Sequence, residues 1–206
     1  DGNTWFENKK TLPTTGYWQS IAYGNGMFVS LSYNSNKSIY SYDGVNWKLS
    51  ELPTTGNWYS ISYGNGMFVS FSVNSNKYIY SYDGINWEES TLPTTGSWYS
   101  IVYGNGMFVS IKSNNNKALY SHDGISWAES ETQISSNFRA FSYGNGMFVS
   151  LNYQSSNISY SYDAVTWFTA DLENVVNWGF ITFGVNKFVI ISSGVPSNLS
   201  LTINDF

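Results

Sequence analysis

Four aspartates recur at the same position of a repeated segment and are the first residues to consider for chemistry. Each follows a Ser by two residues and precedes a Trp by four, and they are Asp43, Asp83, Asp123 and Asp163. No copy has a second Asp or Glu beside the first. A calcium site needs several converging oxygen ligands, and glycoside hydrolysis needs two carboxyl groups about 5 to 10 Å apart. We therefore expect these aspartates to be structural.

The remaining acidic pairs and the single histidine do not complete a catalytic site. Glu88 and Glu89 adjoin, and Glu129 and Glu131 are two residues apart. Both pairs fall at the ends of predicted outer strands, where charges commonly solvate an edge. His122 replaces the Tyr of the sister segments, which favours a tolerated substitution over a general base. We predict that the protein is not an enzyme and that it holds no metal or cofactor.

Neutral polar residues beside aromatic rings indicate binding instead. The segments YNSNK, VNSNK and SNNNK supply amide and hydroxyl groups with one Lys each, and a Trp follows each LPTTG segment by two residues. An Asn offers donor and acceptor to a sugar hydroxyl, and a Trp ring covers the apolar face of a pyranose. The predicted ligand-binding residues are Trp18, Asn34, Asn36, Lys37, Trp58, Asn74, Asn76, Lys77, Trp98, Asn114, Asn116 and Lys117.

The same residue types also have a structural explanation, since Asn and Ser form turns and the three Trp side chains can belong to the core. Repetition favours binding, because weak sites that are joined rigidly gain avidity for a repetitive ligand. We expect up to three equivalent sites. The last two repeats differ, because the fourth replaces LPTTG with QISSN and introduces Arg139, and the fifth has SGVPSN without a Lys.

The elements that position these residues follow from an internal repeat. YGNGMFVS begins at Tyr23 and recurs three times at intervals of forty residues, and a divergent copy, FGVNKFVI, begins at Phe183. The first unit shows four short strand patterns, WQSIAY, MFVSLS, SIYSY and WKLSE, separated by the turns GNG and DGVN, the polar loop YNSNK and the link LPTTG. Repeats of this length with four strands are typical of propeller blades. We predict an all-β, five-bladed β-propeller with four antiparallel strands per blade.

The two ends of the chain predict how the ring closes. Residues 1–5, DGNTW, match the third-to-fourth-strand turn, and the last unit ends at SLTINDF before its own fourth strand. Pairing of residues 5–9 with residues 199–203 would complete the fifth blade and remove exposed edges. We therefore expect a single domain, 1–206, that is excised from a longer protein. Its units are about 12–51, 52–91, 92–131, 132–171, and 172–206 plus 1–11.

Two further side-chain positions carry expectations. The four methionines of the repeated octapeptide, Met27, Met67, Met107 and Met147, are expected to fill gaps between blades. Ala164 stands where the other repeats have Gly, which predicts that this turn position does not need a positive φ.

Composition excludes several classes of function. The net charge is −5, which does not favour nucleic-acid binding. There is no Cys, so neither a disulfide frame nor a Cys-based metal site is expected. No run of 18 apolar residues is present, so no membrane insertion is expected. Aromatic residues make up 19% of the chain and supply ample surface for a core.

The second repeated motif resembles a known family signature. SYDGVNW, SYDGINW, SHDGISW and SYDAVTW resemble the Asp-box of sialidases and of many secreted or phage-borne propellers, although they are one residue shorter than the commonest form. The resemblance implies that the Asp accepts backbone N–H bonds within the turn and that the Trp packs against the blade. Sialidases hold their substrate with three Arg, and this chain has only Arg139, which argues against that activity.

The two motifs together resemble the propeller repeats of phage tail fibres and prophage-derived surface proteins, and the blade count is similar to tachylectin-type lectins. This resemblance implies a lectin-like receptor-binding module whose partner is a glycan or cell-wall polysaccharide, located extracellularly or on a virion surface. The domain is expected to be monomeric within an oligomeric parent. The alternatives are a protein-interaction platform that binds peptides at a central mouth, and a structural spacer without a ligand.

Overall fold

A computed structural model describes residue 7 and residues 10–113, 117–131, 138–152, 155–176, 178–192 and 200–203. The regular structure of this described part consists of eighteen β-strands in antiparallel pairs. No helix within it is long and apolar enough to cross a membrane. The prediction of an all-β chain with antiparallel sheets is confirmed.

The strands form four sheets. The first sheet has the order β1-β2-β3-β4, with β1 (Trp18–Gly24), β2 (Met27–Ser32), β3 (Ser35–Ser41) and β4 (Lys48–Gly56). A seven-stranded sheet has the order β11-β10-β9-β8-β7-β6-β5, with β5 (Trp58–Gly64), β6 (Met67–Ser72), β7 (Ser75–Ser81), β8 (Glu88–Gly104), β9 (Met107–Ser113), β10 (Ala118–Ser121) and β11 (Ala128–Glu129).

The last two sheets follow the chain order. One is β12-β13-β14-β15, with β12 (Phe138–Gly144), β13 (Met147–Asn152), β14 (Ser155–Ser161) and β15 (Phe168–Val176). The other is β16-β17-β18, with β16 (Trp178–Gly184), β17 (Lys187–Ser192) and β18 (Ser200–Ile203).

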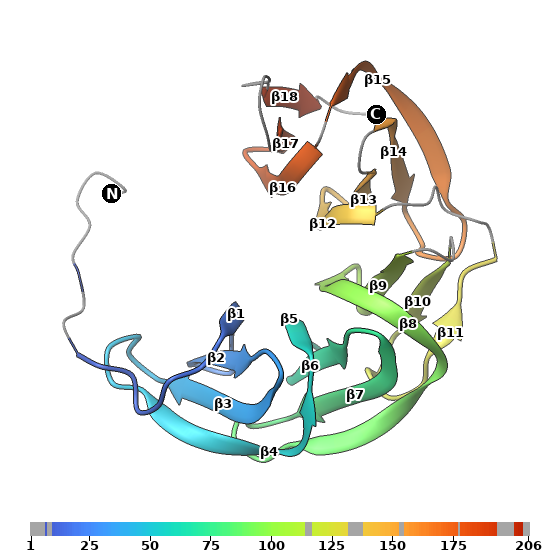
Figure 1. Cartoon of the computed structure of the whole chain (residues 1–206). Helices are drawn as coiled ribbons and strands as arrows, with labels where there is room; N and C mark the ends of the chain where they lie inside the picture. The colour runs from blue at the N-terminus through green and yellow to red at the C-terminus, as the bar shows by residue number, and fades with distance from the viewer. Residues whose placement is uncertain are drawn as a thin grey trace.

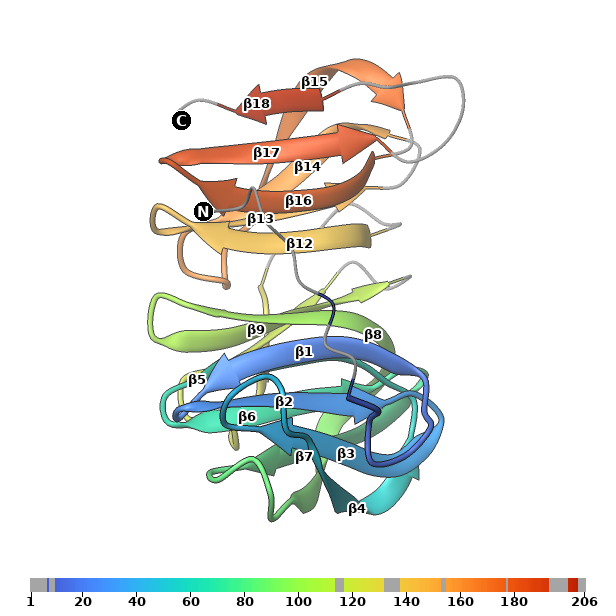
Figure 2. The same cartoon turned by 90° about the vertical axis from the view of Figure 1, so that its left-hand side faces the viewer.

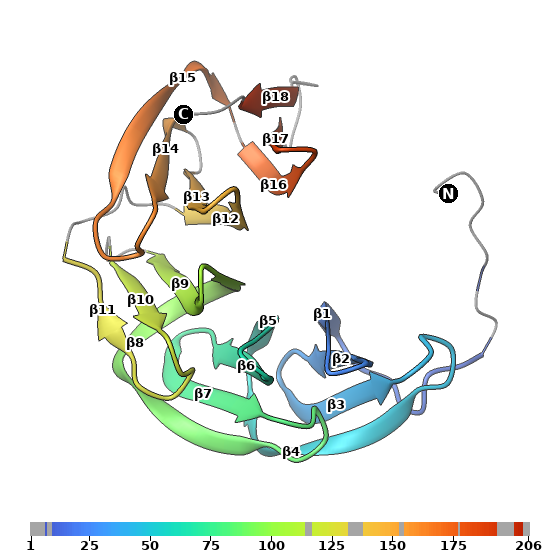
Figure 3. The ribbon, with the colours of Figure 1, turned by 180° about the vertical axis from the view of Figure 1, so that it is seen from behind.

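The sheets follow one another along an arc (Figure 1), with β1, β5, β12 and β16 on its inner side and β4, β11 and β15 on its outer side. The seven-stranded sheet contains two repeats that share β8. The first half of β8 pairs with β7 and the second half pairs with β9. Seen from behind (Figure 3), β8 runs along the outside of β7 and ends beside β9.

Two predicted connections are strands in the structure. The LPTTG segments 52–56 and 92–96, expected as links, are the final residues of β4 and the middle of β8, whereas the first, 12–16, is not in a strand. The loop YNSNK is mostly β3, because Asn34 takes a left-handed φ of 51° and completes a two-residue connection at Tyr33–Asn34. Asn74 does the same in the second repeat, with a φ of 58°. Asn tolerates this conformation better than other non-Gly residues, so the loop is shorter than predicted.

The GNG turns explain part of the repeated octapeptide. Between β1 and β2, Asn25 and Gly26 have φ values of 48° and 74°. Two successive residues with positive φ form the two-residue hairpin turn that matches the strand twist, and Asn-Gly is the preferred pair there.

Tyr and Gly of the octapeptide form the contact between successive repeats. A β-carbon added to Gly24 would lie 2.0 Å from Cγ of Tyr63 in the next repeat. The same close approach occurs in the pairs Gly64–Tyr103, Gly104–Tyr143 and Gly144–Phe183. We call this contact the glycine–aromatic seam. Since a ring packs directly on the backbone, only a residue without a side chain fits.

Methionine and the Ser-Asp turn complete the contact between repeats. Met27 is 3% exposed, and its sulfur lies 2.6 Å from the position of a β-carbon at Gly84 in the next repeat, which confirms that methionines fill gaps between repeats. Ala164 occupies the equivalent turn position with a φ of 61°, against 70° at Gly84. The prediction that this position does not need a positive φ is therefore wrong. Ala accepts the conformation here while fully buried beside Met107.

The Ser-Asp turns hold their aspartates by backbone hydrogen bonds, as expected. Oδ1 of Asp43 accepts the N–H groups of Val45 and Asn46, at 2.8 and 2.7 Å. The Ser41 hydroxyl accepts the N–H of Gly44 at 2.9 Å. Hydrogen bonds from Asn46, and then from Val45, hold the pKa of the Asp43 carboxyl well below its usual range. The Asp43 carboxylate therefore stabilises its own turn.

The described sheets do not close into a ring. Figure 2, seen from the open side, shows the sheets of β1 and β16 at the two ends of the arc. Among the described residues no atom lies within 4 Å of a β-carbon built at Gly184, the fifth copy of the seam glycine. Of the predicted closing pair of segments, 5–9 and 199–203, the first lies outside the described residues apart from residue 7, and the second is described as β18 from residue 200 onward. The described part of the last sheet has three strands.

Replacing Gly64 with Ala should destabilise the fold, because the new β-carbon would overlap the Tyr103 ring. We expect a loss of about 1–3 kcal/mol in the free energy of unfolding, as for overpacked cores. Chemical denaturation measures this. Gly184→Ala is the matched control, since the same position of the last repeat has open space. Equal losses for the two variants would show that the seam does not limit side-chain size.

The Asp83 turn predicts acid sensitivity. Burial raises the pKa of Asp83, but the hydrogen bonds from Asn86 and Ile85 outweigh it and lower the pKa to about 2. The ionised form therefore stabilises the fold above the ordinary pKa of about 4, and this contribution is lost as the pH falls towards 2. In Asp83→Asn the unfolding free energy should fall less between these pH values than in wild type. Tyr82→Phe is the control, and an Asp83→Asn profile parallel to wild type would contradict the prediction.

Candidate functional site

Three tyrosines from successive repeats form a partly exposed row. Tyr33 contacts Tyr59 edge to face with 5.9 Å between ring centroids, and Tyr59 contacts Tyr99 in the same way at 5.5 Å. Tyr59 and Tyr99 are 41% and 39% exposed. We call these three residues the tyrosine row. Tyr59 lies on β5, Tyr99 lies on the second half of β8, and Tyr33 lies in the turn between β2 and β3.

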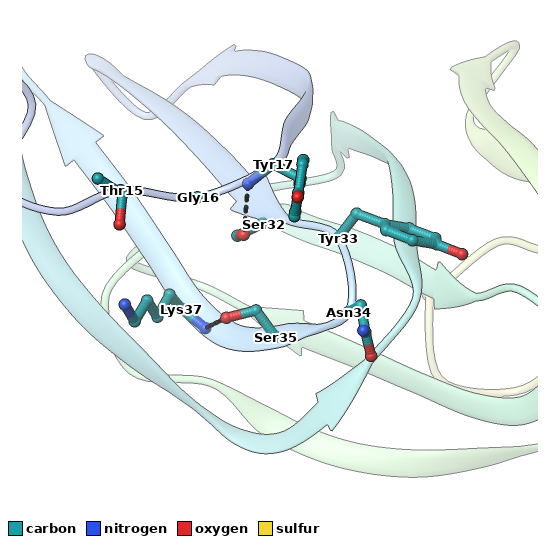
Figure 4. A pocket seen from close by; sticks show the side chains of 8 residues that line it. All are labelled: Thr15, Gly16, Tyr17, Ser32, Tyr33, Asn34, Ser35 and Lys37. Carbon is teal, nitrogen blue, oxygen red and sulfur yellow. Dashed lines mark hydrogen bonds between the residues drawn. The ribbon is translucent and has the colours of Figure 1, made fainter.

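A pocket of about 420 Å³ adjoins the row in the first repeat. Its lining includes Tyr33 itself (Figure 4), with Tyr17 and Asn34 close by. The Ser32 hydroxyl accepts the N–H of Tyr17 at 3.1 Å, and the Tyr33 N–H donates to the Tyr17 carbonyl at 2.8 Å. These bonds fix the chain beside the pocket. The full lining is Thr15, Gly16, Tyr17, Ser32, Tyr33, Asn34, Ser35 and Lys37.

The predicted lysines are used within the fold. The ammonium of Lys37 donates to the Thr14 hydroxyl at 3.0 Å, and that of Lys77 donates to Thr54 at 3.2 Å. Lys77 also forms an ion pair with Glu89 at 2.9 Å. Each of these lysines therefore ties β3 or β7 to the LPTTG segment that precedes its repeat. Lys117 instead donates to the Ser130 carbonyl, at 2.7 Å.

The predicted tryptophans divide into two groups. Trp58 and Trp98 are 1% and 2% exposed, and their indole N–H groups donate to the carbonyls of Ser35 and Ser75 at 3.0 and 3.2 Å. Their rings cannot stack on a ligand. Only Trp18 is half-buried, because in the described part no preceding repeat covers it.

Of the predicted asparagines, Asn34 and Asn74 lie at the turns after β2 and β6, and Asn36 and Asn76 lie in β3 and β7. Asn34, Asn36 and Asn74 are exposed and Asn76 is half-buried. Asn74 accepts the Ser97 hydroxyl at 2.6 Å. Asn114 and Asn116 lie outside the described residues. The structure thus brings Asn34 and Lys37 together in the pocket, whose lining does not include Trp58.

The acidic pair considered for catalysis takes part in local contacts. Glu88 accepts the Tyr80 hydroxyl at 2.7 Å, and this hydrogen bond raises the pKa of Tyr80 to about 12. Its neighbour Glu89 pairs with Lys77. His122 is exposed on a Ser-Asp turn, where its carbonyl accepts the Asn65 amide at 3.3 Å. Within the described residues no group of three or more His, Asp or Glu is placed to hold a metal.

Sequence reasoning missed the tyrosine row although a signal was present. In both WYS segments the Trp is buried, and alternation along a strand turns the following residue to the opposite face. Tyr59 and Tyr99 therefore face outward wherever Trp58 and Trp98 face the core. The edge-to-face contact with Tyr33 comes from a different repeat, and spacing alone does not reveal it.

Comparison with known proteins shows the fold. No protein-family model matches the chain, and no curated protein matches it in sequence. Virginiamycin B lyase from Staphylococcus aureus is 17% identical with a TM-score of 0.74, over 94% of this chain and 72% of the lyase. A structure described as YCF48 bound to D1 peptide is 16% identical with a TM-score of 0.68, over 94% of this chain and 68% of that one.

A chain of a nidogen/laminin complex is also similar, with 10% identity and a TM-score of 0.65 over 91% of this chain and 75% of that one. These likenesses support a propeller fold for the chain. They also correct one prediction. The expectation that the protein is not an enzyme does not stand, because the same fold carries the activity of virginiamycin B lyase. The lack of paired carboxylates argued against glycoside hydrolysis only, and a fold by itself does not decide activity.

Proposed function

We propose that the chain is a polypeptide-binding module whose binding surface is the tyrosine row with the adjoining pocket. The observation that carries this proposal is the row itself, three rings in edge-to-face contact across three repeats. Such contacts hold the rings in place before a ligand arrives, so that little side-chain entropy is lost on binding. Tyr, Ser and Asn are also the residues that antibody loops favour for binding protein surfaces.

Several features favour an extended peptide. The row and the pocket share Tyr33 and so form one continuous surface. Amide and hydroxyl groups at Asn34, Ser35 and Thr15 border it, and these groups can pair with peptide N–H and C=O groups. A similar propeller, YCF48, has been described bound to D1 peptide, which supports the same mode here.

The pocket favours a second candidate function, binding of a glycan. A volume of about 420 Å³ suits a single sugar ring, and Tyr17 beside it is 74% exposed and free to cover an apolar sugar face. This candidate agrees with the resemblance to phage tail-fibre and tachylectin-type propellers and with a location outside cells or on a virion. Because Trp58 and Trp98 are buried, it rests on tyrosine rather than tryptophan rings.

The primary proposal is tested with peptides selected from a random-peptide library on the wild-type protein. Tyr59→Ala and Tyr99→Ala should each weaken binding of the selected peptides about tenfold or more, since buried aromatic anchors dominate such interfaces. Titration calorimetry measures the affinities. Tyr82→Ala is the matched control, because Tyr82 is 59% exposed on a Ser-Asp turn away from the row. Unchanged affinity in both row variants would overturn the proposal.

A glycan array separates the two candidates. If the pocket binds sugar, Tyr17→Ala should abolish the array signal, because it removes the exposed ring beside the pocket. Tyr99→Ala should leave the signal intact, because Tyr99 does not line the pocket. An array without any signal, together with selected peptides that depend on Tyr59 and Tyr99, would favour the polypeptide ligand.

A further inference from the structure

Every contact between successive repeats has two different sides. The earlier repeat presents its seam glycine, its methionine and a valine, which we call the glycine side. The later repeat presents the ring that covers the glycine, which we call the aromatic side. A hydrogen bond from backbone to side chain crosses the same contact, since the Ile61 N–H donates to the Ser20 hydroxyl at 3.3 Å and the Ile101 N–H donates to the Ser60 hydroxyl at 3.2 Å.

The first repeat has an aromatic side that no described residue covers. Tyr23, the counterpart of Tyr63, is 61% exposed, and Ile21 is 56% exposed although its counterpart Ile61 is 6% exposed. Leu12 is 41% exposed, whereas its counterpart Leu52 is 4% exposed. We call the surface of Leu12, Trp18, Ile21 and Tyr23 the first end face.

The last repeat has the opposite, glycine side, and within the described part of the chain nothing covers it. Gly184 has open space where the other seam glycines meet a ring. Val189 and Ile191 are 37% and 46% exposed, whereas their counterparts Val29 and Leu31 are 0% and 2% exposed. We call the surface of Gly184, Lys187, Val189 and Ile191 the second end face.

The two end faces are the two halves of a contact that the molecule already makes internally. Leu31 packs in one cluster with Leu52 and Trp58 of the following contact. By the same arrangement, Ile191 would pack against Leu12 and Trp18, which line an apolar pocket of about 500 Å³. The exposed apolar side chains of the second end face are thus complementary in shape and polarity to the apolar pocket on the first end face.

The two end faces are also complementary in charge. Lys187 stands at the position of Met27, whose sulfur approaches Gly84 of the next repeat. The equivalent position opposite Lys187 is Gly44, which adjoins the carboxylate of Asp43. A Lys in place of Met would therefore lie beside a negative charge. It also keeps the uncovered end face soluble in the free molecule.

We propose that the second end face of one copy binds the first end face of a second copy, head to tail, through a fifth glycine–aromatic seam between Gly184 and Tyr23. A contact between copies is favoured over closure within one chain by the shape of the arc. The described sheets of β1 and β16 stand apart at the two ends of the arc (Figure 1), and the chain covers 72%, 68% and 75% of the lengths of the similar structures. Such a heterologous interface extends an assembly rather than forming a two-fold dimer.

Cysteine trapping tests the proposal, since the native chain has no Cys. In the internal seam a β-carbon at Gly24 would touch the Tyr63 ring directly, so cysteines at these two positions lie close enough to be joined by a disulfide. Single variants Tyr23→Cys and Gly184→Cys should form a disulfide-linked dimer when mixed and oxidised. Either variant alone should give several-fold less dimer. Gly24→Cys/Tyr63→Cys is the positive control for seam geometry.

The double variant Tyr23→Cys/Gly184→Cys distinguishes the occupants of the end faces. Disulfide-linked dimers and longer species support binding between copies. A monomer with an internal disulfide overturns the proposal and shows closure within one chain. Unlinked monomers at high concentration, where the positive control is fully oxidised, also overturn it.

Sedimentation velocity provides a test without disulfides. The weight-average mass of the wild-type chain should rise with concentration, and Tyr23→Ala should shift that rise to several-fold higher concentration. Tyr82→Ala, an equally exposed tyrosine away from the end faces, should leave it unchanged. A wild-type mass that stays monomeric at all concentrations contradicts the proposal.

Discussion

The packing of an aromatic ring directly on a glycine backbone is the constraint on which the rest of the structure depends. At four successive contacts a ring occupies the volume where a side chain would start, and this sets how closely neighbouring sheets approach. Because the same pair recurs at every contact, the sheets are placed at a regular interval along the arc. The repeated octapeptide is conserved within the chain because one face of each copy packs on the previous repeat and the other face packs on the next.

Outside the glycine–aromatic seam, the repeats present two surfaces with different chemistry, one formed by the Ser-Asp turns and one that includes the tyrosine row. On one, the Ser-Asp turns bind their own carboxylates with backbone N–H groups, so the negative charges there serve the fold. On the other, alternation places Trp58 and Trp98 in the core and turns Tyr59 and Tyr99 outward. Each buried indole holds the turn of the previous repeat through its N–H group. The proposed binding surface is therefore built on side chains that also join the repeats.

The fold class could be predicted from the sequence, but only part of the candidate binding site could. Forty-residue spacing, period-two patterns and Asn-Gly turns were sufficient to predict antiparallel sheets and buried methionines, and the resemblance to the Asp-box implied the hydrogen-bonded aspartates. The predicted loop after β2 was too long, because Asn34 makes a two-residue turn through a left-handed φ. The tryptophans were assigned to ligand binding because a residue type does not state which side of a strand is buried. The prediction that the protein is not an enzyme was wrong for a related reason. A similar fold occurs in a lyase, and such a fold is compatible with activities that the sequence motifs of this chain do not indicate.

By itself the sequence determined the repeat, the strands and the turns, because those depend on local backbone preferences and on alternation over a few residues. Only the tertiary structure decided which rings are exposed, that Tyr33, Tyr59 and Tyr99 meet across three repeats, and that the two ends of the arc remain uncovered in the described part. The physical reason is that burial and ring contacts depend on how neighbouring sheets are placed, and that placement comes from contacts between residues about forty positions apart.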